Sequence, residues 1–229
     1  MMLKVATYNI HAGIGHDRHF DMHRITAVIN ELDADIIALQ EVEHQLIDDQ
    51  LLLQFLETYT DYKVISDVTF KRDNYDYGNV LLSKQPLADV IYHDLSVAGR
   101  EPRSLIEAQL VFDNKKIIIM STHLGLRPFE RRFQVQKILS LLATRADQQT
   151  IFMGDLNEWF LWGRPHRWLK RHFKQSHNLP TFPARYPFLC LDKIWVSPAN
   201  ALINVAVHRS PLARVASDHL PIIAKIEII

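Results

Sequence analysis

The sequence is poor in cysteine and glycine, carries no net charge and lacks a long apolar run. Cys190 is the single cysteine among 229 residues, which excludes a disulfide within the chain and is typical of a reducing compartment. Seven glycines and 48% hydrophobic residues exclude a collagen-like repeat and a disordered chain. No stretch approaches the roughly 18 uncharged apolar residues of a membrane span, and the N-terminus lacks the apolar core of a signal peptide. We therefore expect a soluble, cytoplasmic protein.

The zero net charge conceals two halves of opposite sign. Acidic residues exceed basic ones by ten in residues 1–114, and basic residues exceed acidic ones by ten in residues 115–229. If both halves contribute to one cleft, acidic groups can hold a cation opposite basic groups that attract an anion. Two solvated faces would produce the same totals, so the asymmetry alone identifies no site.

Short strand-like runs alternate with helical patterns along the chain. Apolar spacing predicts helices at 22–32, 48–57 and 128–146. Strands are predicted at 3–10, 35–41, 62–66, 79–83, 90–94, 104–112, 116–122, 150–153, 191–196, 203–208 and 222–228. Closely spaced strands occur together with strand–helix units, which indicates two mixed sheets face to face with helices outside. No Ser/Gly-rich linker interrupts the chain, so we expect a single α/β domain over residues 1–229.

Polar side chains stand where the predicted strands end, and strand ends are where ligands usually bind in layered α/β folds. These residues are Asn9, Glu41, His123, Asp155, Asn157, Asp192, Asp218 and His219. A carboxylate such as Glu41 after an apolar strand is costly unless it is compensated, and a Mg²⁺ ion held by carboxylates and water would compensate it. Taken singly, each residue also has a structural explanation as a turn former, a helix cap or a core histidine. Their spacing therefore leaves the reaction class open.

The residue types suggest chemical roles. In Gly154-Asp155-Leu156-Asn157, the side chains at positions i and i+2 share one face of an extended backbone. Asp155 can then position or deprotonate a water while Asn157 donates to a phosphoryl oxygen. His219 would gain a fixed tautomer and a raised pKa from a carboxylate, for which Asp192 is the candidate.

Other polar residues suit supporting roles at the same edge. Asn9 can supply an amide oxygen or orient Glu41. His123 and Arg103 are suitable donors to the charge that develops on a phosphate in a transition state.

Seven motifs occur in order along the chain. They are Thr7-Tyr8-Asn9-Ile10, Ala38-Leu39-Gln40-Glu41-Val42, Tyr77-Gly78-Asn79-Val80-Leu81-Leu82-Ser83, Ser121-Thr122-His123-Leu124, Gly154-Asp155-Leu156-Asn157, Leu191-Asp192-Lys193-Ile194-Trp195-Val196 and Ser217-Asp218-His219. Together they resemble the endonuclease/exonuclease/phosphatase superfamily over nearly the whole chain. The resemblance implies a four-layer α/β sandwich, with two mixed β-sheets face to face, flanked by helices, and a site at one edge. It also implies Mg²⁺- or Mn²⁺-dependent hydrolysis of a phosphoester by in-line attack of water.

The resemblance also implies a role for each matching residue. The metal ligands would be Glu41, as the principal one, Asn9 and Asp218. The catalytic residues would be Asp155, His219, Asp192 and His123. Asp155 would orient the water, and His219, paired with Asp192, would be the acid/base. His123 would contact the scissile phosphate. The substrate-binding residues would be Asn157, Arg103 and Asn79.

The chain departs from two branches of this superfamily. It has Asn79 and one cysteine, whereas secreted deoxyribonucleases carry a glutamate near that position and use disulfides. Its first motif continues as His11-Ala12-Gly13-Ile14-Gly15, unlike that of abasic-site nucleases. Two segments, Ile10-His11-Ala12-Gly13 and His123-Leu124-Gly125-Leu126, resemble those of general bacterial members and of phospholipid- or sphingomyelin-cleaving relatives. Nucleic acid, phospholipid and other small phosphoesters all stay open as substrates, as do diester and monoester.

Residues 159–174 interleave aromatic and basic side chains. Basic and aromatic residues together can bind single-stranded nucleic acid by stacking and charge, or rest on an anionic lipid surface. The alternative is an ordinary amphipathic helix with Pro165 in its first turn, whose aromatic side chains pack on the sandwich.

Two functions of different classes compete at this point. A Mg²⁺-dependent phosphodiesterase is the leading hypothesis, because metal and donors would neutralise the phosphate while Asp155 aligns the water. A catalytically silent binding or scaffold module on the same fold is the alternative. The retained acidic, amide and imidazole residues favour the enzyme.

Overall fold

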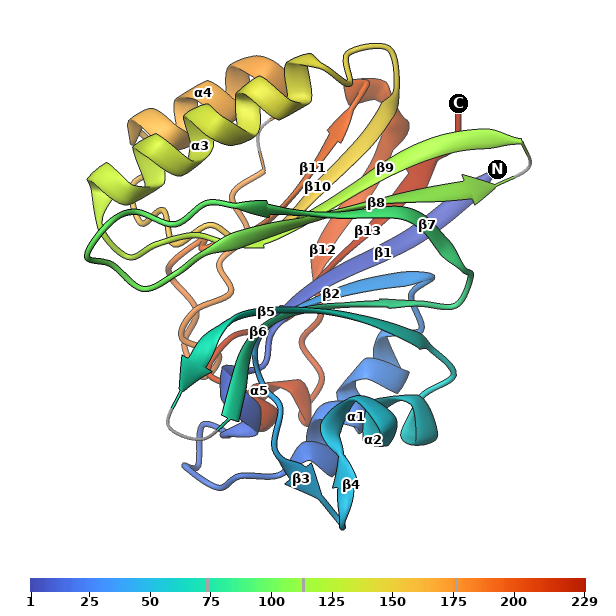
Figure 1. The fold of residues 1–229 in the computed structure, drawn as a ribbon, viewed down its shortest axis with the longest axis vertical. Helices are drawn as coiled ribbons and strands as arrows, with labels where there is room; N and C mark the ends of the chain where they lie inside the picture. Colours follow the sequence, from blue (N-terminus) through green and yellow to red (C-terminus); the bar gives the residue numbers. More distant parts are fainter. Residues whose placement is uncertain (73–74, 113, 176) are drawn as a thin grey trace.

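A computed structural model describes residues 1–72, 75–112, 114–175 and 177–229. Two large mixed sheets lie face to face, and helices cover the outer face of each sheet (Figure 1). The predicted order of layers, helix–sheet–sheet–helix, is therefore confirmed.

The first sheet has six strands within the described ranges. Their order across the sheet is β12 (Leu202–Val207), β13 (Ile222–Glu227), β1 (Met2–Asn9), β2 (Ile36–Glu43), β6 (Tyr75–Ser83) and β5 (Lys63–Arg72). β1 and β2 run parallel, and the other neighbours in this sheet are antiparallel. β2 is central, as its apolar character on both faces predicts.

The second sheet has five strands among the residues described. Their order is β11 (Asp192–Ser197), β10 (Gln149–Asp155), β9 (Lys115–His123), β8 (Ser104–Phe112) and β7 (Leu87–Asp94). β9 and β10 are parallel, and the remaining pairs are antiparallel. A short ribbon of β3 (Leu46–Ile47) and β4 (Gln50–Leu51) stands apart from both sheets.

Helices cover the two outer faces of the sandwich. The first sheet is covered by α1 (Met22–Leu32), α2 (Leu52–Tyr59) and α5 (Ala213–Ala216), and the second by α3 (Pro128–Ala143) and α4 (Arg164–Phe173). Short 3-10 turns form at η1 (His11–Gly13) and η2 (Ala199–Ala201). Within the described ranges, none of the helices has the length and apolarity that a membrane crossing needs.

The sequence dictates α1 directly. The side chain of Asp21 accepts the backbone N–H of Arg24 over 3.0 Å, which caps the helix at its start. Ile25, Val28 and Ile29 then recur on one face and are fully buried. The helix therefore lies where its apolar stripe meets the outer face of the first sheet.

The core has one apolar layer between the two sheets and one between each sheet and the helices that cover it. Side chains of alternating residues on β2 point to opposite faces, so Ile37 and Leu39 pack with α1 while Ile36 and Ala38 join the layer between the sheets. On the other side of that layer are isoleucines from β9, β10 and β11, including Ile119. This apolar layer holds the strand ends of both sheets at a fixed separation.

Two predicted helices have different bounds in the structure. The helix predicted at 48–57 begins at Leu52 and ends at Tyr59. Asp48 and Asp49 adopt left-handed φ angles of 49° and 61° in the turn between β3 and β4, which a helix cannot contain. The helix predicted to reach residue 146 ends at Ala143, where the Thr144 side chain bonds back to the Leu141 carbonyl.

The strands predicted at 62–66 and 79–83 are longer than expected. β5 continues to Arg72 and β6 begins at Tyr75, because the two strands pair with each other as an antiparallel hairpin beyond the body of the sheet. Polar residues in that extension obscure its strand character, since main-chain pairing between the two strands requires no apolar side chain.

Candidate active site

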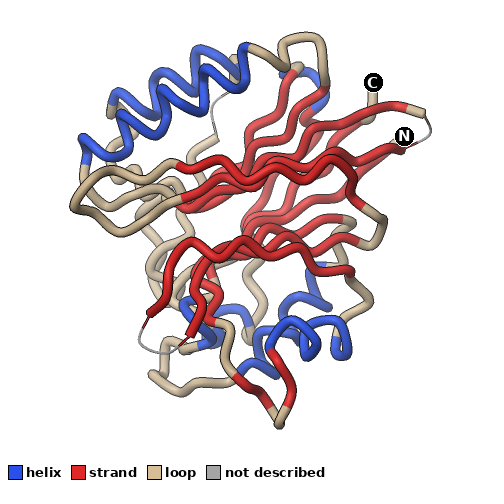
Figure 2. Tube along the Cα trace, viewed as in Figure 1, coloured by secondary structure: helices blue, strands red, loops and turns tan. Residues whose placement is uncertain are grey.

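Polar residues from both sheets lie at one edge of the sandwich, where loops gather (Figure 2). In the second sheet, the register places Asp155 beside His123 of parallel β9 and beside Asp192 of antiparallel β11. In the first sheet, Asn9 at the end of β1 lies beside Gln40 of parallel β2. Parallel pairing sets the carboxyl ends of these strands side by side, so the predicted polar residues meet at this edge.

Glu41 enters the site through an irregularity in β2. The register of β2 against β6 shifts between Leu39 and Val42, and Glu41 has a left-handed φ of 57°. A bulge re-aims the side chain that it contains, and a left-handed conformation is costly for a residue with a Cβ. The fold therefore holds strained backbone where Glu41 turns toward the other sheet.

Asn9 joins Glu41 to Asp155. Its Nδ2 atom donates to Glu41 Oε1 and to Asp155 Oδ2, each over 3.0 Å, and its Oδ1 atom accepts the backbone N–H of His11. Asn9 is 1% exposed. This geometry supports the orienting role weighed for Asn9, and its role as a metal ligand stays a prediction.

Glu41 is held as an anion. Burial alone would raise its pKa, but the nearby His123 and His219 rings and hydrogen bonds from Asn9 and Tyr77 outweigh burial and lower the pKa to about 2. Burial and the charge of Glu41 correspondingly raise the pKa of the Tyr77 hydroxyl. The Glu41 carboxylate is therefore ionised and hydrogen-bonded at neutral pH.

The backbone around Gly154 explains why this motif begins with glycine. Gly154 has a φ of 144°, and a Cβ atom there would lie 1.9 Å from the Thr122 carbonyl oxygen of β9. Asn157 adopts a left-handed φ of 49°, and its backbone N–H donates to Asp155 Oδ1 over 2.9 Å. The tight turn after β10 thereby fixes the Asp155 carboxylate while leaving Oδ2 toward Asn9.

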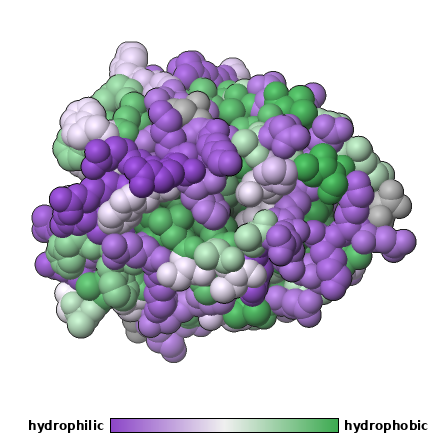
Figure 3. Space-filling model, turned by 90° about the horizontal axis from the view of Figure 1, so that it is seen from above, coloured by the Kyte–Doolittle hydropathy of each residue, from purple (hydrophilic) through white to green (hydrophobic). Residues whose placement is uncertain are grey.

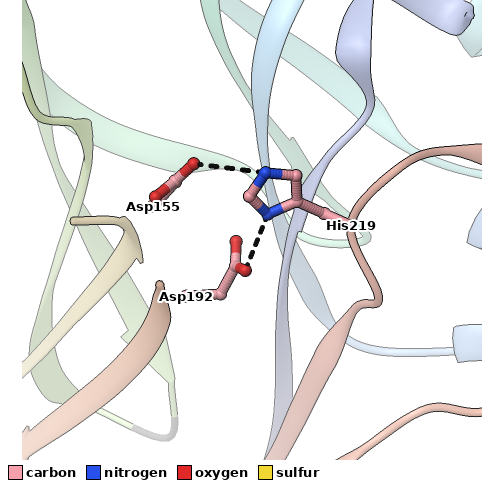
Figure 4. A group of neighbouring side chains, drawn as sticks. All are labelled: Asp155, Asp192 and His219. Carbon is pink, nitrogen blue, oxygen red and sulfur yellow. Dashed lines mark hydrogen bonds and ion pairs between the residues drawn. The ribbon is translucent and has the colours of Figure 1, made fainter. Parts of the chain in front are cut away.

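His219 lies between two carboxylates (Figure 4). Its Nδ1 atom is 2.9 Å from Asp192 Oδ2, and its Nε2 atom is 3.8 Å from Asp155 Oδ2. Burial lowers the pKa of His219, but the charges of Asp192 and Asp155 outweigh burial and raise it to about 10. Burial and the charge of Asp192 raise the pKa of Asp155 to about 6. At neutral pH the site therefore holds an imidazolium beside ionised carboxylates.

His123 lies on the other side of Asp155. Its Nε2 atom is 3.6 Å from Asp155 Oδ2 and 2.9 Å from Asn157 Nδ2, and its Nδ1 atom is 3.3 Å from Nη1 of Arg103. Burial and the charge of Arg103 lower the pKa of His123 to about 3, so the ring is neutral at physiological pH. Glu101 pairs with Arg103 over 2.7 Å and fixes the other end of the guanidinium.

A cavity of about 460 Å³ opens on these groups. The predicted site residues that line it are Glu41, Arg103, His123, Asp155, Asn157, Asp218 and His219. Asp192 is fully buried behind His219, and Asn9 lies beneath the two carboxylates that it bridges. The structure thus brings together most of the residues that the sequence selects.

Asn79 differs from the other predicted residues. It is buried within β6, its Nδ2 atom lies 3.5 Å from Ser104 Oγ, and it is outside the set of residues that line the cavity. Asn79 and Tyr77 are two residues apart on β6 and so share a face of the strand, but only Tyr77 borders the cavity. Direct contact of Asn79 with substrate therefore stays a prediction.

The cavity offers oxygen donors suited to a hard divalent cation. Glu41 is ionised, Asp155 approaches it closely enough for one amide group to bridge both, and Asp218 borders the same cavity. Mg²⁺ prefers one or two carboxylates with water completing its coordination. Asp155, Asp192 and His219 also have ligand atoms within 4.8 Å of one another. Asp192 Oδ2 is bonded to His219 and Thr181, whereas Asp192 Oδ1 has no hydrogen-bond partner among the described residues. Glu41 borders the cavity and Asp192 does not, so a cation that contacts substrate fits better at Glu41.

Two supporting residues escape sequence reasoning. Thr181 Oγ1 donates to Asp192 Oδ2 over 2.6 Å from a loop far from any strand end. Phe182 packs against the His219 ring with the ring centres 4.8 Å apart. Neither has a distinguishing pattern in the sequence. Tyr77, which supports Glu41, does stand in one of the seven motifs, next to the glycine of that motif.

The segment 159–174 divides into a loop and a helix. Leu169 and Phe173 of α4 are buried, and Trp168 is partly buried against the same core. Pro165 lies in the first turn of α4, as predicted. Trp159, which precedes the helix, instead borders the cavity. The amphipathic-helix interpretation therefore holds for α4 and does not account for the loop.

Comparison with known proteins gives a consistent result. The model of the Endonuclease/Exonuclease/phosphatase family matches residues 6–219. The chain is 29% identical to YbhP of Escherichia coli (strain K12) over an alignment of 246 positions, which covers 98% of this chain and 96% of YbhP. Among solved structures, an endonuclease/exonuclease/phosphatase from Bacteroides vulgatus is similar over 100% of both chains, with a TM-score of 0.81 at 18% identity. D. rerio TDP2 complexed with single strand DNA product is similar over 99% of both chains, with a TM-score of 0.72 at 19% identity.

Proposed function

The chain belongs to the Endonuclease/Exonuclease/phosphatase family, and from this premise we propose that it is a Mg²⁺-dependent phosphoesterase that hydrolyses a phosphodiester. One observation carries the proposal. Glu41 from one sheet, and Asp155 with the His219–Asp192 pair around the other, converge on a single cavity. A binding module has no need of an ionised carboxylate, a carboxyl group that titrates near neutral pH and an imidazolium at one point.

Glu41 and Asp218 would hold the cation, Mg²⁺ or Mn²⁺, with Asn9 keeping Glu41 in position. A divalent cation bound there supplies positive charge to the phosphate oxygens and so stabilises charge that develops in the transition state. The ionised state of Glu41 at neutral pH supports this assignment, since a carboxylate must be deprotonated to act as a ligand.

Asp155 would align the attacking water and accept its proton. A pKa near 6 leaves Asp155 ionised at neutral pH and keeps its basicity above that of an ordinary aspartate. His219 would donate to a phosphate oxygen through Nε2, because Asp192 holds the ring from the opposite side through Nδ1. Asn157, His123 and Arg103 would bind the remaining phosphate oxygens from the second sheet.

The substrate class is left open between nucleic acid and a phospholipid or other small phosphoester. The D. rerio TDP2 structure holds a single strand DNA product, so nucleic acid is one substrate that this fold accommodates. A cytoplasmic location is likewise a prediction from the sequence.

Hydrolysis of bis(p-nitrophenyl) phosphate tests the proposal. We expect turnover with Mg²⁺ and none above background after EDTA treatment. Glu41→Gln and Asp155→Asn should each lower kcat by at least about a hundredfold, because each removes a charge used in the transition state. A panel of plasmid, single-stranded oligonucleotide, phospholipid and inositol phosphate substrates, with a monoester for comparison, then identifies the preferred substrate class.

Asp61→Asn is the matched control, since Asp61 is exposed and outside the residues that border the cavity. It should leave kcat unchanged. Turnover that survives EDTA, or that is unaffected by Glu41→Gln in a folded variant, would contradict the proposal.

A further inference from the structure

The loop that leads from β10 to α4 exposes consecutive apolar side chains. Trp159 is 55% exposed, Trp162 is 73% exposed, and Phe160 and Leu161 between them are also exposed. Burying a large apolar side chain gains about 1.5–3 kcal/mol, so four exposed in a row are unusual for a surface that faces only water. We call residues 159–162 the aromatic loop.

Contacts of Glu158 hold the aromatic loop in place. Glu158, immediately before it, forms a buried ion pair with Arg131 of α3, with 3.3 Å between Glu158 Oε2 and Arg131 Nε. Phe160 N also donates to Glu158 Oε1 over 3.2 Å. The outward position of the apolar side chains is therefore built into the fold.

The exposed charges that neighbour the aromatic loop along the chain have a single sign. In residues 156–175 and 177–188, the only acidic residue is Glu158, and it is buried. The exposed charged residues of these ranges are all basic: Arg164, Arg167, Lys170, Arg171, Lys174 and Arg185. Figure 3 views the molecule from the side of α3 and α4, where hydrophobic patches lie among hydrophilic residues. The surface therefore complements an anionic partner that also accepts apolar side chains.

We propose that the aromatic loop and the basic residues of α4 form a docking surface for an anionic lipid bilayer. Tryptophan side chains favour the interface between lipid and water, and lysine and arginine are attracted to anionic headgroups by about 1 kcal/mol each. Single-stranded nucleic acid fits this surface less well. Leu161 has no face on which a base can stack, and the rings of Phe160 and Trp162 already contact each other, 5.1 Å apart and inclined by 40°.

The position of the surface gives docking a consequence. Trp159 and the exposed Leu126, in the loop between β9 and α3, border the same cavity as Glu41 and Asp155. A bilayer against the aromatic loop would therefore face the mouth of the candidate active site with its headgroup phosphates. The docking surface goes beyond the proposed hydrolysis and does not depend on it, because binding is measured without turnover.

Sedimentation with vesicles tests the inference. Vesicles of phosphatidylcholine mixed with phosphatidylglycerol should bind the intact chain, and vesicles of phosphatidylcholine alone should bind it at least about tenfold more weakly. The double variant Phe160→Ser/Trp162→Ser should lose at least about tenfold in affinity for the mixed vesicles. Lys170→Glu/Arg171→Glu should bind both kinds of vesicle equally weakly, because its surface charge is reversed. Lipids brominated in the acyl chain should quench the tryptophan fluorescence of the wild-type chain on binding.

Two control variants distinguish binding through this surface from nonspecific binding of exposed apolar side chains and from an effect of hydrolysis. Ile203→Ser removes a side chain that is 54% exposed on β12, on the other sheet, and should bind mixed vesicles like the wild type. Asp155→Asn should also bind normally, since hydrolysis is not required. Thermal melting checks that each variant is folded.

Three outcomes would overturn the inference. One is equal binding of the wild type and the Phe160/Trp162 variant to mixed vesicles. Another is loss of single-stranded oligonucleotide binding in that variant while the wild type ignores vesicles. The third is sedimentation velocity showing that the aromatic loop joins two copies of the chain instead.

Discussion

Asn9 and Asp155 come from different sheets and are 146 positions apart, yet the side-chain amide of Asn9 donates to Asp155 Oδ2 over 3.0 Å. The same Nδ2 atom donates to Glu41, so one buried amide group bridges the two carboxylates on which the proposed chemistry depends. This bond ties the active-site edges of the two sheets together. The amide nitrogen of Asn9 faces the two carboxylates.

Asn9→Ala should affect activity and stability through those carboxylates. Without the amide, Glu41 and Asp155 face each other with no shared donor, so we expect kcat to fall about 10- to 100-fold. The variant should melt at a lower temperature than the wild type, and Mg²⁺ should raise its melting temperature by more, because the cation compensates two carboxylates that the amide no longer bridges. Asn30→Ala is the control, since Asn30 donates to the Tyr59 carbonyl at an exposed position away from the site. Equal kcat in Asn9→Ala and the wild type would contradict the orienting role.

Asp192→Asn should lower the pKa of His219 from about 10 toward its ordinary value. The charge of Asp192 is the main cause that raises this pKa, and asparagine keeps the size while removing the charge. Titration of the imidazole resonances by NMR measures the change, and kcat should fall less than in His219→Ala. Thr181→Val removes the other hydrogen bond to Asp192 but keeps its charge, so His219 should titrate at high pH in that variant. A pKa for His219 that is identical in Asp192→Asn and the wild type would contradict the role of Asp192 in raising that pKa.

Glu158→Gln should destabilise the fold by about 3 kcal/mol. Arg131 is 2% exposed and Glu158 is 6% exposed, so the substitution leaves a buried guanidinium without its counter-charge. Urea denaturation measures the free energy of unfolding, and Arg131→Met in the same chain should recover part of the loss. The pair of Lys84 and Asp33 is more exposed and screened by water, so Asp33→Asn should destabilise the fold less than Glu158→Gln does. Equal losses in the two single variants would show that burial of the Arg131 pair has no special energetic effect.

His177 should make the folded state less stable in acid. Burial and the charge of Lys193 lower its pKa to about 4, and its Nε2 atom accepts the backbone N–H of Ile194 over 3.4 Å, which requires that nitrogen to be unprotonated. The unfolded chain therefore binds a proton on this ring near pH 6.5, whereas the folded chain binds it only near pH 4. The contribution to stability is complete above about pH 6.5 and is lost as the pH falls toward 4.

Urea denaturation at pH 7.5 and pH 5 checks this expectation. Because His177 is partly exposed, we expect the wild type to lose about 1 kcal/mol more than His177→Gln between these two pH values. His16→Gln, at an exposed position, should follow the wild type. A loss in His177→Gln as large as in the wild type would show that another group causes the acid sensitivity.

The sequence alone predicts the layers and most of the site, because both follow from the types of residue that are neighbours along the chain. Apolar strands such as residues 35–41 end in polar residues such as Glu41, and that contrast is visible without coordinates. The same locality limits the prediction of boundaries. Asp48 and Asp49 fit a helix pattern by spacing, but the left-handed turn that they form decides where α2 begins.

Only the tertiary structure decides which polar atoms meet. Thr181 reaches Asp192 from an irregular loop, and Asn79 contacts Ser104 and lies outside the residues that line the cavity although it stands in a motif. The aromatic loop and α4 belong to one aromatic and basic segment of the sequence, but only α4 covers an apolar surface with its large side chains. The sequence determined which segments are apolar, which residues are ionisable and where strands end, because these follow from residue type and spacing. The packing of two sheets decided the direction of each side chain and its partners, because these depend on residues brought together from distant parts of the chain.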